Sequence, residues 1–382
     1  MDSIFSPPLH RQRHQFVIDF VKRNKPKKVV DLGCSECSLL QKLKFHREIE
    51  LLVGVDIDGA NIKKRCMHGL APMSTDYLQP SYDQLRIELY QGSVTQEDAR
   101  LRGFDLVTSI ELIEHLTLAD VKRFSEVVFG YMTPVAVIVS TPNSEFNPLF
   151  PRPAGFRHSD HKFEWTRAEF KSWALKVCLE YGYEVEFTGV GQAPPGQQER
   201  VGFCSQIGVF HWLGGRQECN MLFGDDAEDV FSYTLLYSIN YPSLHDNNIL
   251  QRVLVSEVLY WAEKMKRNWI EERTGERDDT YTLCPAEGEG EECLRACVSV
   301  PLAVLWSCCP KLSALSGSLS NLRHVLMDNP EVKLSQDGSA VLLNDQEQDL
   351  EEEEEDHDDL EDSGYAVCSH GAEPEEDWEK NV

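Results

Sequence analysis

The chain has 382 residues, 41% of them hydrophobic, and a formal net charge of −27. This length is enough to bury one large core or two smaller ones, which leaves room for an enzyme-sized domain. The N-terminus lacks the apolar stretch of a signal peptide, and no later stretch stays apolar for the ~18 residues of a membrane span. We therefore expect a soluble intracellular protein with no membrane partner, whose 12 cysteines are mostly reduced core residues.

The negative charge is concentrated at the end of the sequence. Residues 345–382 contain 18 Asp or Glu residues against one Lys, and a segment that repels itself in this way cannot bury enough surface to fold. Residues 344–382 are therefore predicted to form an acidic disordered tail. Residues 1–28 form a basic segment instead, with a net charge of +5. Because the two charged segments are separate, the acidic total does not exclude a nucleic-acid partner.

From residue 29 onward, short apolar strands alternate with helical segments, which is the pattern of a doubly wound, Rossmann-like α/β sheet. A helix is predicted over Asn247–Trp269, where apolar residues recur at helical spacing, and we expect it to pack on the same domain. We therefore assign residues 29–270 to one catalytic domain, whereas residues 271–343 form an extension of poorly defined architecture. Seven strands are predicted, over Lys28–Leu32, Leu51–Asp56, Arg86–Gln91, Phe104–Ser109, Val135–Ser140, Glu184–Thr188 and Ser205–Phe210.

The first strand ends in a turn of small residues, Asp31-Leu32-Gly33-Cys34-Ser35, which lets a ligand approach the backbone. Asp56 ends the second strand 23 positions after Gly33, where its carboxylate can accept hydrogen bonds from both hydroxyls of a ribose. Ser35 and Ser38 replace glycines that a dinucleotide turn needs to hold a pyrophosphate, so the pattern favours S-adenosylmethionine, which carries no phosphate. The alternative is an ordinary strand-to-helix turn. The predicted cofactor-binding residues are Asp31, Gly33, Cys34, Asp56, Ser93 and Ile110.

The fourth strand runs into Glu111, Glu114 and His115. If a helix begins there, Glu111 lies one turn from the other two, and the three side chains converge at the catalytic edge of the sheet. Carboxylate oxygens with one imidazole nitrogen suit Mg²⁺ or Mn²⁺ better than tetrahedral zinc. Small-molecule methyltransferases carry a similar Glu-His pair without a metal, so the pattern alone leaves both interpretations open. A fourth ligand is expected from the loop after the fifth strand, either His161 or His158.

A divalent ion at this position explains a reaction at a ribose hydroxyl, because it lowers the pKa of an oxygen that it binds and aligns that oxygen with the methyl donor. Only a terminal ribose offers free 2′ and 3′ hydroxyls together, so such a site would recognise the end of a strand, and RNA rather than DNA. His115 is the favoured proton acceptor, with His161 as the alternative. The cations that offer phosphate contacts are Arg11, Arg13, Arg157, Lys162 and Arg167; the alternative for each is solvated surface.

Five blocks resemble a known family, the HUA-enhancer type of small-RNA 3′-terminal 2′-O-methyltransferases, which modify plant microRNAs and animal Piwi-interacting RNAs. The resemblance extends over Phe5–Trp269 and implies a class I, seven-stranded S-adenosylmethionine-dependent methyltransferase fold. It places metal ligands at Glu111, Glu114, His115 and His161, which favours His161 over His158, and cofactor contacts at the Gly33 turn and Asp56. The blocks are DLGCSECSLL from Asp31, GVDID from Gly54, SIELIEHL from Ser109, STPNSEFN from Ser140 and FRHSDHKFEWTR from Phe156.

The sequence lacks the double-stranded-RNA modules of the plant members and is similar to the animal form. This resemblance implies a single-stranded small RNA held by a Piwi-class Argonaute protein, and a cytoplasmic location that includes germ-cell RNA granules. Ser35 and Cys37 depart from the glycine-rich turn common among methyltransferases. Two other functions are considered, a small-molecule O-methyltransferase and a non-catalytic adaptor; the first needs an apolar lid instead of cations, and the second has no need for intact Asp56 and Glu114.

Overall fold

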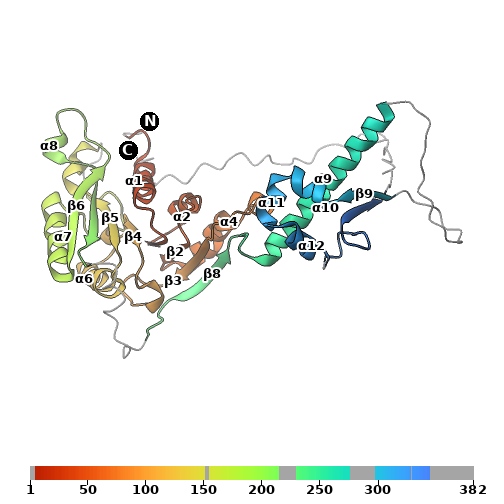
Figure 1. The fold of residues 1–382 in the computed structure, drawn as a ribbon. Helices are drawn as coiled ribbons and strands as arrows, with labels where there is room; N and C mark the ends of the chain where they lie inside the picture. Colours follow the sequence, from red (N-terminus) through yellow and green to blue (C-terminus); the bar gives the residue numbers. More distant parts are fainter. Residues whose placement is uncertain (1–4, 151–154, 215–228, 276–296, 328, 345–382) are drawn as a thin grey trace, which may run out of the picture. The chain divides into compact units, whose positions relative to one another are not determined.

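The computed structural model describes residues 5–150, 155–214, 229–275, 297–327 and 329–344 (Figure 1). Within this part, the chain divides into two compact units, one formed by residues 5–76 and 83–241 and the other by Tyr77–Tyr82 and the residues from Pro242 onward. The boundary therefore lies well before the predicted one at residue 270. The predicted acidic tail begins at residue 344, which is the last residue of a described strand, and the rest of it, residues 345–382, lies outside the described part.

The first unit is built on one mixed sheet with the strand order β6-β7-β5-β4-β1-β2-β3-β8. The central strands are parallel, while β7 pairs antiparallel with β5 and β6, and β8 pairs antiparallel with β3. All seven predicted strands are present, and β8 is an eighth that the sequence analysis did not predict. The strands are β1 (Lys28–Leu32), β2 (Leu51–Asp56), β3 (Arg86–Gln91), β4 (Leu106–Ile110), β5 (Ala136–Pro142), β6 (Tyr183–Val190), β7 (Ser205–Trp212) and β8 (Thr234–Asn240).

Helices cover both faces of this sheet, because neighbouring residues of the buried strands point to opposite faces. On one face, Val30 and Val53 belong to a core cluster that includes Phe124, Phe129 and Phe170 from the helical segments after β4 and β5. On the other face, Val29 and Leu52 pack with residues from the N-terminal helix and the helices that follow β1 and β2. The α-helices of this unit are α1 (Leu9–Asn24), α2 (Ser38–Leu43), α3 (Gly59–Asn61), α4 (Met67–Leu70), α6 (Leu118–Ser125), α7 (Arg167–Tyr181) and α8 (Gln198–Val201), and α5 (Ser74–Leu78) begins in this unit and ends in the second.

Short segments of other helical types complete the unit. Two π-helices, η1 (Ile62–Cys66) and η4 (Glu126–Met132), continue α3 and α6. Three 3₁₀ turns occur at η2 (Ala99–Leu101), η3 (Ile113–His115) and η5 (Ser144–Leu149). Of these, η3 and η5 follow directly after the catalytic ends of β4 and β5, so they position the side chains described below.

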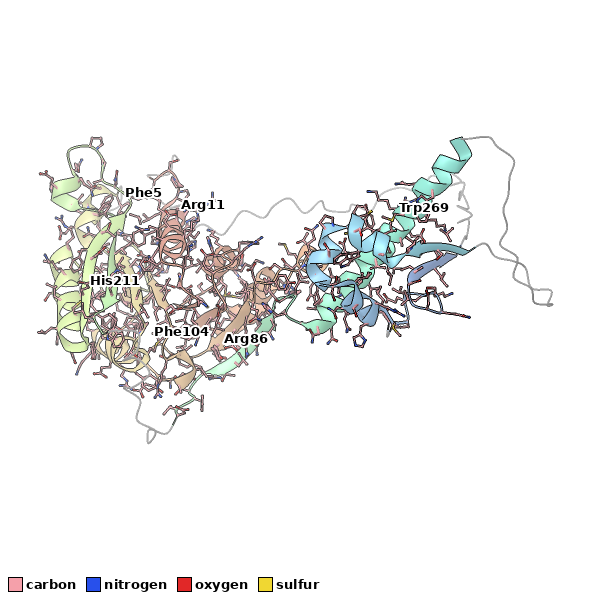
Figure 2. All side chains as sticks on the ribbon, in the orientation of Figure 1. Phe5, Arg11, Arg86, Phe104, His211 and Trp269 are labelled. Carbon is pink, nitrogen blue, oxygen red and sulfur yellow. A yellow bond between two sulfur atoms is a disulfide. The ribbon has the colours of Figure 1, made fainter. Side chains whose placement is uncertain are left out.

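The basic N-terminal segment is part of the folded unit, because α1 packs against the sheet through Val17, Phe20 and Val21. Figure 2 labels Arg11, which lies on α1, and Phe5, which precedes the helix. Arg11 is exposed, whereas Arg13 keeps only 2% of its surface accessible. The helix therefore buries Arg13 inside the unit and presents other cations, including Arg11, to solvent.

The second unit has its own core, formed by α9 (Asn247–Gly275), β9 (Cys297–Pro301), α10 (Leu302–Cys308), α11 (Pro310–Ser316), α12 (Leu319–Met327) and β10 (Ala340–Asn344). Strands β9 and β10 form an antiparallel pair. Helix α9 buries Leu254 and Val258 against Leu302, Leu312 and other residues of this unit. The expectation that this helix packs on the catalytic domain was therefore wrong: its apolar stripe is buried by the extension that follows it. No described helix is both long and apolar enough to cross a bilayer.

Candidate active site

The carboxyl ends of the parallel strands meet at one edge of the sheet, which is where doubly wound proteins bind ligands. Asp31 on β1 pairs in register with Gly54 on β2, and Thr108 on β4 pairs with Asp31. The turns after these strands therefore lie next to one another. The predicted cofactor and metal residues follow directly from these strand ends.

The turn after β1 adopts a left-handed backbone that glycine tolerates best. Gly33 has a φ of 77°, and its N–H donates to the carbonyl of Val55 at 2.8 Å. A Cβ at this position would lie 2.8 Å from Cδ1 of Leu112. Two positions on, the N–H of Ser35 donates to Oδ2 of Asp56 at 2.8 Å. The carboxylate of Asp56 thus fixes the turn and retains lone pairs for a ribose.

Two cysteines connect this turn to the segment after β2. Cys37 and Cys66 form a disulfide, with their Cα atoms 5.4 Å apart. Sγ of Cys34 lies 3.7 Å from Sγ of Cys37, and Cys34 is itself buried. The expectation that most cysteines are reduced did not single out this pair, whose members lie 29 positions apart in the sequence.

The other predicted cofactor residues also lie along this edge. Asp31 is buried and accepts a hydrogen bond from Oγ1 of Thr108 at 2.6 Å. Burial raises the pKa of Asp31 to about 7, against the effect of that hydrogen bond. Ile110 is the last residue of β4, and the carbonyl of Ser93, after β3, accepts a hydrogen bond from the hydroxyl of Tyr233.

After β4 the chain does not form the predicted α-helix. Glu111 has a φ of 51°, and η3 then forms a single 3₁₀ turn. This turn directs Glu114 inward, where it is fully buried and accepts a hydrogen bond from Oγ1 of Thr141 at 3.0 Å. Its other oxygen, Oε1, has no hydrogen-bond partner among the described residues. Burial and the nearby carboxylate of Glu111 raise the pKa of Glu114 well above its usual value.

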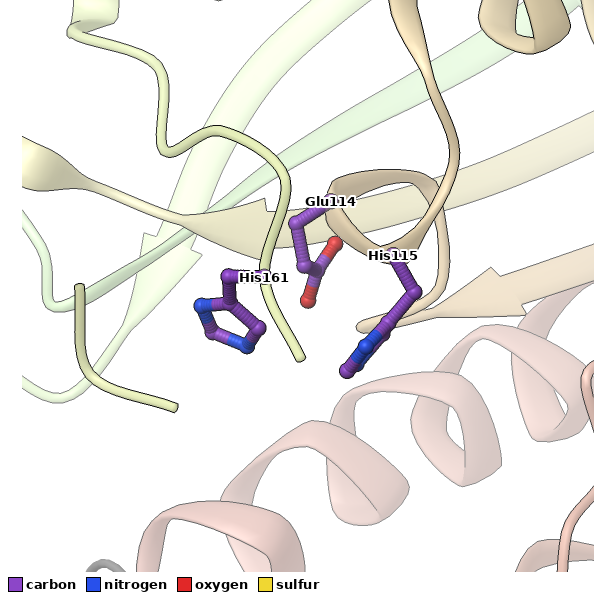
Figure 3. Close-up of side chains that lie close together, drawn as sticks. All are labelled: Glu114, His115 and His161. Atoms are coloured by element: carbon purple, nitrogen blue, oxygen red, sulfur yellow. The ribbon is translucent and has the colours of Figure 1, made fainter. Parts of the chain in front are cut away.

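Glu114, His115 and His161 gather at one point, as Figure 3 shows, with possible ligand atoms all within 4.8 Å of one another. The rings of His115 and His161 have centroids 4.9 Å apart. Burial, followed by the neighbouring His161 and His158, lowers the pKa of His115, which keeps its imidazole neutral and able to bind a metal. Three of the four predicted ligands therefore converge, although they come from two segments far apart in the sequence.

Glu164 orients His161. Its Oε1 lies 2.6 Å from Nδ1 of His161, which leaves Nε2 available to the cluster. Although burial opposes it, hydrogen bonds from His161, from Asn147 and from the backbone of Arg157 lower the pKa of Glu164. A carboxylate that fixes the far nitrogen of a histidine is the usual arrangement behind a metal ligand.

Glu111, the fourth predicted ligand, lies outside this cluster. Its Oε1 accepts hydrogen bonds from the hydroxyls of Ser140 at 2.9 Å and Ser205 at 2.6 Å. Its Oε2 lies 3.5 Å from Nη1 of Arg13. The left-handed backbone at Glu111 turns its side chain toward these groups. His158, the alternative to His161, has its ring centroid 6.2 Å from that of His115 and is not part of the cluster.

The cluster suits a divalent cation. It combines one carboxylate oxygen and two imidazoles, a set that binds divalent transition ions such as Mn²⁺, Fe²⁺ or Zn²⁺, whereas Mg²⁺ would need several waters to complete its preferred oxygen ligands. A buried oxygen without a partner is costly unless a cation or a donor satisfies it. Glu114, His115 and His161 would hold such an ion, whereas the carboxylate of Glu111 is not part of the cluster and acts on the pKa of Glu114.

The structure gives the predicted RNA-binding cations different surroundings. The guanidinium of Arg157 is directed into the protein, where it donates to Asn147, to the carbonyl of Cys204 and to the carbonyl of Asn143. Arg167 pairs with Glu145 at 2.6 Å, and Arg13 is buried beside Glu111. Arg13 and Arg157 therefore stabilise the site from inside the protein, whereas Arg167 stays partly exposed to solvent with its charge paired to Glu145. Arg11 and Lys162 are exposed, as phosphate contacts require.

Sequence reasoning missed the residues that hold the cluster in place. Thr141, Ser140 and Ser205 contact the two carboxylates from β5 and β7. Ser140 and Thr141 lie in the block STPNSEFN, which the resemblance singles out, whereas no pattern in the sequence points to Ser205. Glu164 did carry a signal, because it lies three positions after His161 in a block already singled out for its resemblance.

This sheet, with a nucleoside-type turn after β1 and an acidic residue at the end of β2, defines a class I methyltransferase dependent on S-adenosylmethionine. Over 362 residues the chain is 43% identical to a small RNA 2′-O-methyltransferase of Xenopus tropicalis, an alignment that covers 88% of this chain and 96% of the relative. The chain belongs to the small RNA 2′-O-methyltransferase family.

Other comparisons agree. The small RNA 2′-O-methyltransferase of Mus musculus is 42% identical over 370 residues, which cover 89% of this chain and 90% of the relative. A crystal structure of the small RNA methyltransferase HEN1 is similar with a TM-score of 0.50 and 29% identity, over 63% of this chain and 28% of that chain. No family model matches the chain.

Proposed function

We propose that this protein transfers the methyl group of S-adenosylmethionine to the 2′-hydroxyl of the 3′-terminal nucleotide of a small single-stranded RNA, at a site that holds Mg²⁺ or Mn²⁺, and so protects the 3′ end. The observation that carries the proposal is the convergence of Glu114, His115 and His161 beside the cofactor edge. The relatives of the chain are named for 2′-O-methylation of small RNA.

The cofactor supplies an electrophilic methyl group, and a divalent ion, when bound, lowers the pKa of a coordinating hydroxyl. The chain's own residues prepare the site for both. Thr141 fixes one oxygen of Glu114 and leaves the other for the cluster. Glu164 fixes the ring of His161, and Asp56 fixes the cofactor turn. Because Glu114 is fully buried, water has little access to this part of the site.

The proposed selectivity for a strand end follows from the chemistry of ribose. A 3′-terminal nucleotide has adjacent 2′ and 3′ hydroxyls, whereas the 3′ oxygen of an internal nucleotide is esterified. A site that recognises both oxygens therefore accepts RNA ends and rejects DNA, which lacks the 2′-hydroxyl. Sequence specificity is not required for this recognition.

The test is methyl transfer from labelled cofactor to a short single-stranded RNA with a free 3′ end, beside the same RNA with a 3′ phosphate. We expect label only on the free end, its loss on chelation, and its return with Mn²⁺ or Mg²⁺. Equal labelling of both RNAs would rule out recognition of the end. Labelling of small hydroxyl compounds but of neither RNA would favour a small-molecule enzyme, and binding of RNA without any transfer would favour an adaptor.

The variant Glu114→Ala tests the metal cluster within this proposal. We expect transfer to fall to nearly background, because the buried ligand is lost, while cofactor binding measured by calorimetry stays within about twofold. Titration with Mn²⁺ should show weaker binding to this variant. Full activity in Glu114→Ala would contradict the metal-assisted mechanism.

The proposal extends to a partner and a location, with support from the family resemblance alone. The partner is a Piwi-class Argonaute protein that presents the RNA end, and the location is the cytoplasm, including germ-cell RNA granules. Co-purification of the tagged chain with RNA-loaded Argonaute proteins, together with imaging in germ cells, tests both points. An exclusively nuclear signal would overturn the location.

A further inference from the structure

A cavity of about 320 Å³ lies beside the first turn of α7. This volume is at the lower end of the roughly 300–1,000 Å³ range of ligand sites, so it suits one small group instead of a helix or a duplex. None of the predicted cofactor or metal residues lines it. Most of the lining residues lie on α7, β6, β7 and the segment around α8. The lining includes Asn143, Arg167, Lys171, Phe187, Gln198 and Gln206.

Two of these residues offer a cation and an aromatic surface. Nζ of Lys171 lies 5.8 Å from the ring centroid of Phe187, and Phe187 is 40% exposed. Within the described ranges, no carboxylate lies at ion-pair distance from Lys171. Arg167 also lines the cavity, but its charge is neutralised by the ion pair with Glu145. The cavity therefore presents one positive charge without an ion-pair partner in the described part of the chain, that of Lys171, next to the aromatic ring of Phe187.

The amide side chains add hydrogen-bonding groups. Gln206 uses its Nε2 to donate to the carbonyls of Pro142 and Trp165, and Gln198 uses its Oε1 to accept from Ala193. Among the described residues, Oε1 of Gln206 and Nε2 of Gln198 have no hydrogen-bond partner. One acceptor and one donor thus remain for a polar planar group.

A chain of hydrogen bonds connects the lining of the cavity to the metal cluster. Asn143 lines the cavity, and its carbonyl accepts a hydrogen bond from the guanidinium of Arg157. The backbone N–H of Arg157 donates to Oε1 of Glu164, the same oxygen that contacts His161. Three hydrogen bonds, from Asn143 through Arg157 and Glu164 to His161, therefore connect the cavity lining to the cluster.

We propose that this cavity binds one internal nucleotide of the substrate RNA, with the base stacked on Phe187 and the phosphodiester paired with Lys171. One free ammonium matches the single charge of a phosphodiester, and stacking on an aromatic ring accepts any base, as a sequence-independent enzyme requires. This inference rests on the proposed function, since it assigns a second contact for the same RNA. It predicts that affinity depends on RNA length, because a very short strand cannot reach the cavity.

The test compares Lys171→Ala and Phe187→Leu with the native protein, in methyl-transfer kinetics and in RNA binding at several salt concentrations. Lys176→Ala is the matched control, because Lys176 is an exposed lysine on the same helix that does not line the cavity. We expect KM for a long RNA to rise about fivefold in Lys171→Ala and about tenfold in Phe187→Leu, with kcat unchanged. For the shortest RNA that the native protein methylates, KM should be the same in all four proteins.

The salt dependence separates a phosphate contact from a structural effect. Loss of one contact to single-stranded RNA reduces the slope of log K against log salt by about 0.7, and we expect this in Lys171→Ala but not in Phe187→Leu. Unchanged KM and slope in both variants would overturn the inference while native methylation persists. Binding of free adenosine monophosphate that both variants lose, with RNA binding unaltered, would also overturn it. Failure of the native protein to methylate any RNA would instead contradict the proposed function.

Discussion

Glu164 connects the metal cluster to the protein scaffold, and it leads to the first prediction. Its carboxylate accepts hydrogen bonds from His161, Asn147 and the backbone of Arg157. Glu164→Gln removes the negative charge and replaces one carboxylate oxygen with an NH₂ donor, which cannot accept a hydrogen bond from Nδ1 of His161. The ring of His161 is then held less firmly. We expect Mn²⁺ affinity to fall by about 10–100-fold, with cofactor affinity unchanged.

Calorimetric titration with Mn²⁺ checks this prediction. Asp160→Asn is the control, because Asp160 is an exposed carboxylate in the same loop and its loss removes charge without removing the hydrogen bonds to His161. If Glu164→Gln binds Mn²⁺ as tightly as the native protein does, Glu164 has no role in orienting a ligand.

Asp31 leads to the second prediction, which concerns stability and pH. Burial raises the pKa of Asp31 from 3.8 to about 7, so the folded state binds a proton that the unfolded state has released. The stabilisation by this proton is complete below about pH 4 and is lost as the pH rises through 7. Asp31→Asn keeps an acceptor for Thr108 and removes this dependence. We expect the variant to gain stability relative to the native protein between pH 5 and pH 8, by on the order of 3 kcal/mol at most.

Thermal unfolding of both proteins at pH 5 and pH 8 gives the measurement. Because all other titrating groups are shared, the difference between the two proteins isolates Asp31. A difference that stays constant, or that shrinks toward pH 8, would show that this carboxyl is ionised throughout.

How far the sequence predicts the site depends on where the contacts come from. The ends of β1, β2 and β4 must lie at one edge of a parallel sheet, so Asp31, Asp56 and Glu114 could be placed together in advance. The side chain of Glu111 could not, because a φ of 51° reverses its direction. Its partner Ser205 lies 94 positions later in the sequence, and spacing alone contains no information about such contacts.

At the scale of elements, the buried strands and the largely exposed edge strand β6 were predicted, but the edge strand β8 was not. Strands such as β1 and β5 are apolar and buried on both faces, a pattern that is visible in the sequence. The edge strand β8 is mostly exposed and alternates weakly, so it gave no such signal. The pattern of α9 predicted a helix correctly, but an apolar stripe does not specify which domain covers it.

The turn between β1 and α2 leads to the third prediction. In Gly33→Ala the new Cβ would meet Leu112 at 2.8 Å, at a φ of 77° that side chains disfavour. We expect cofactor affinity to fall by about tenfold or more, together with a loss of about 1 kcal/mol in unfolding free energy. Calorimetric titration with S-adenosylmethionine and thermal unfolding measure the two effects.

Gly103→Ala is the control for backbone strain. Gly103 has a similar φ of 65°, but nothing lies within 4 Å of its added Cβ. It should show the loss of stability without the loss of cofactor binding. Equal cofactor affinity in Gly33→Ala and Gly103→Ala would mean that the turn does not contact the cofactor.

At the scale of the whole molecule, the described chain has separate cores in its two units, and this leads to the last prediction. Leu312 is fully buried in the core of the second unit, and Phe124 is fully buried in the core of the first. Replacing either by Ala creates a cavity that costs roughly 2–5 kcal/mol in the unit concerned. Because each unit buries its own apolar residues, we expect two calorimetric transitions, of which each variant lowers only one.

The same variants separate stability from activity. At a temperature below both transitions, Leu312→Ala should methylate RNA at the native rate, because the cofactor turn and the metal cluster lie wholly in the first unit. Leu319→Ala, on the partly exposed start of α12, should leave both transitions within about 1 °C, since little apolar surface is lost. A single transition that both core variants lower equally would instead mean that the units unfold together, and the catalytic unit would then depend on the second core for its stability.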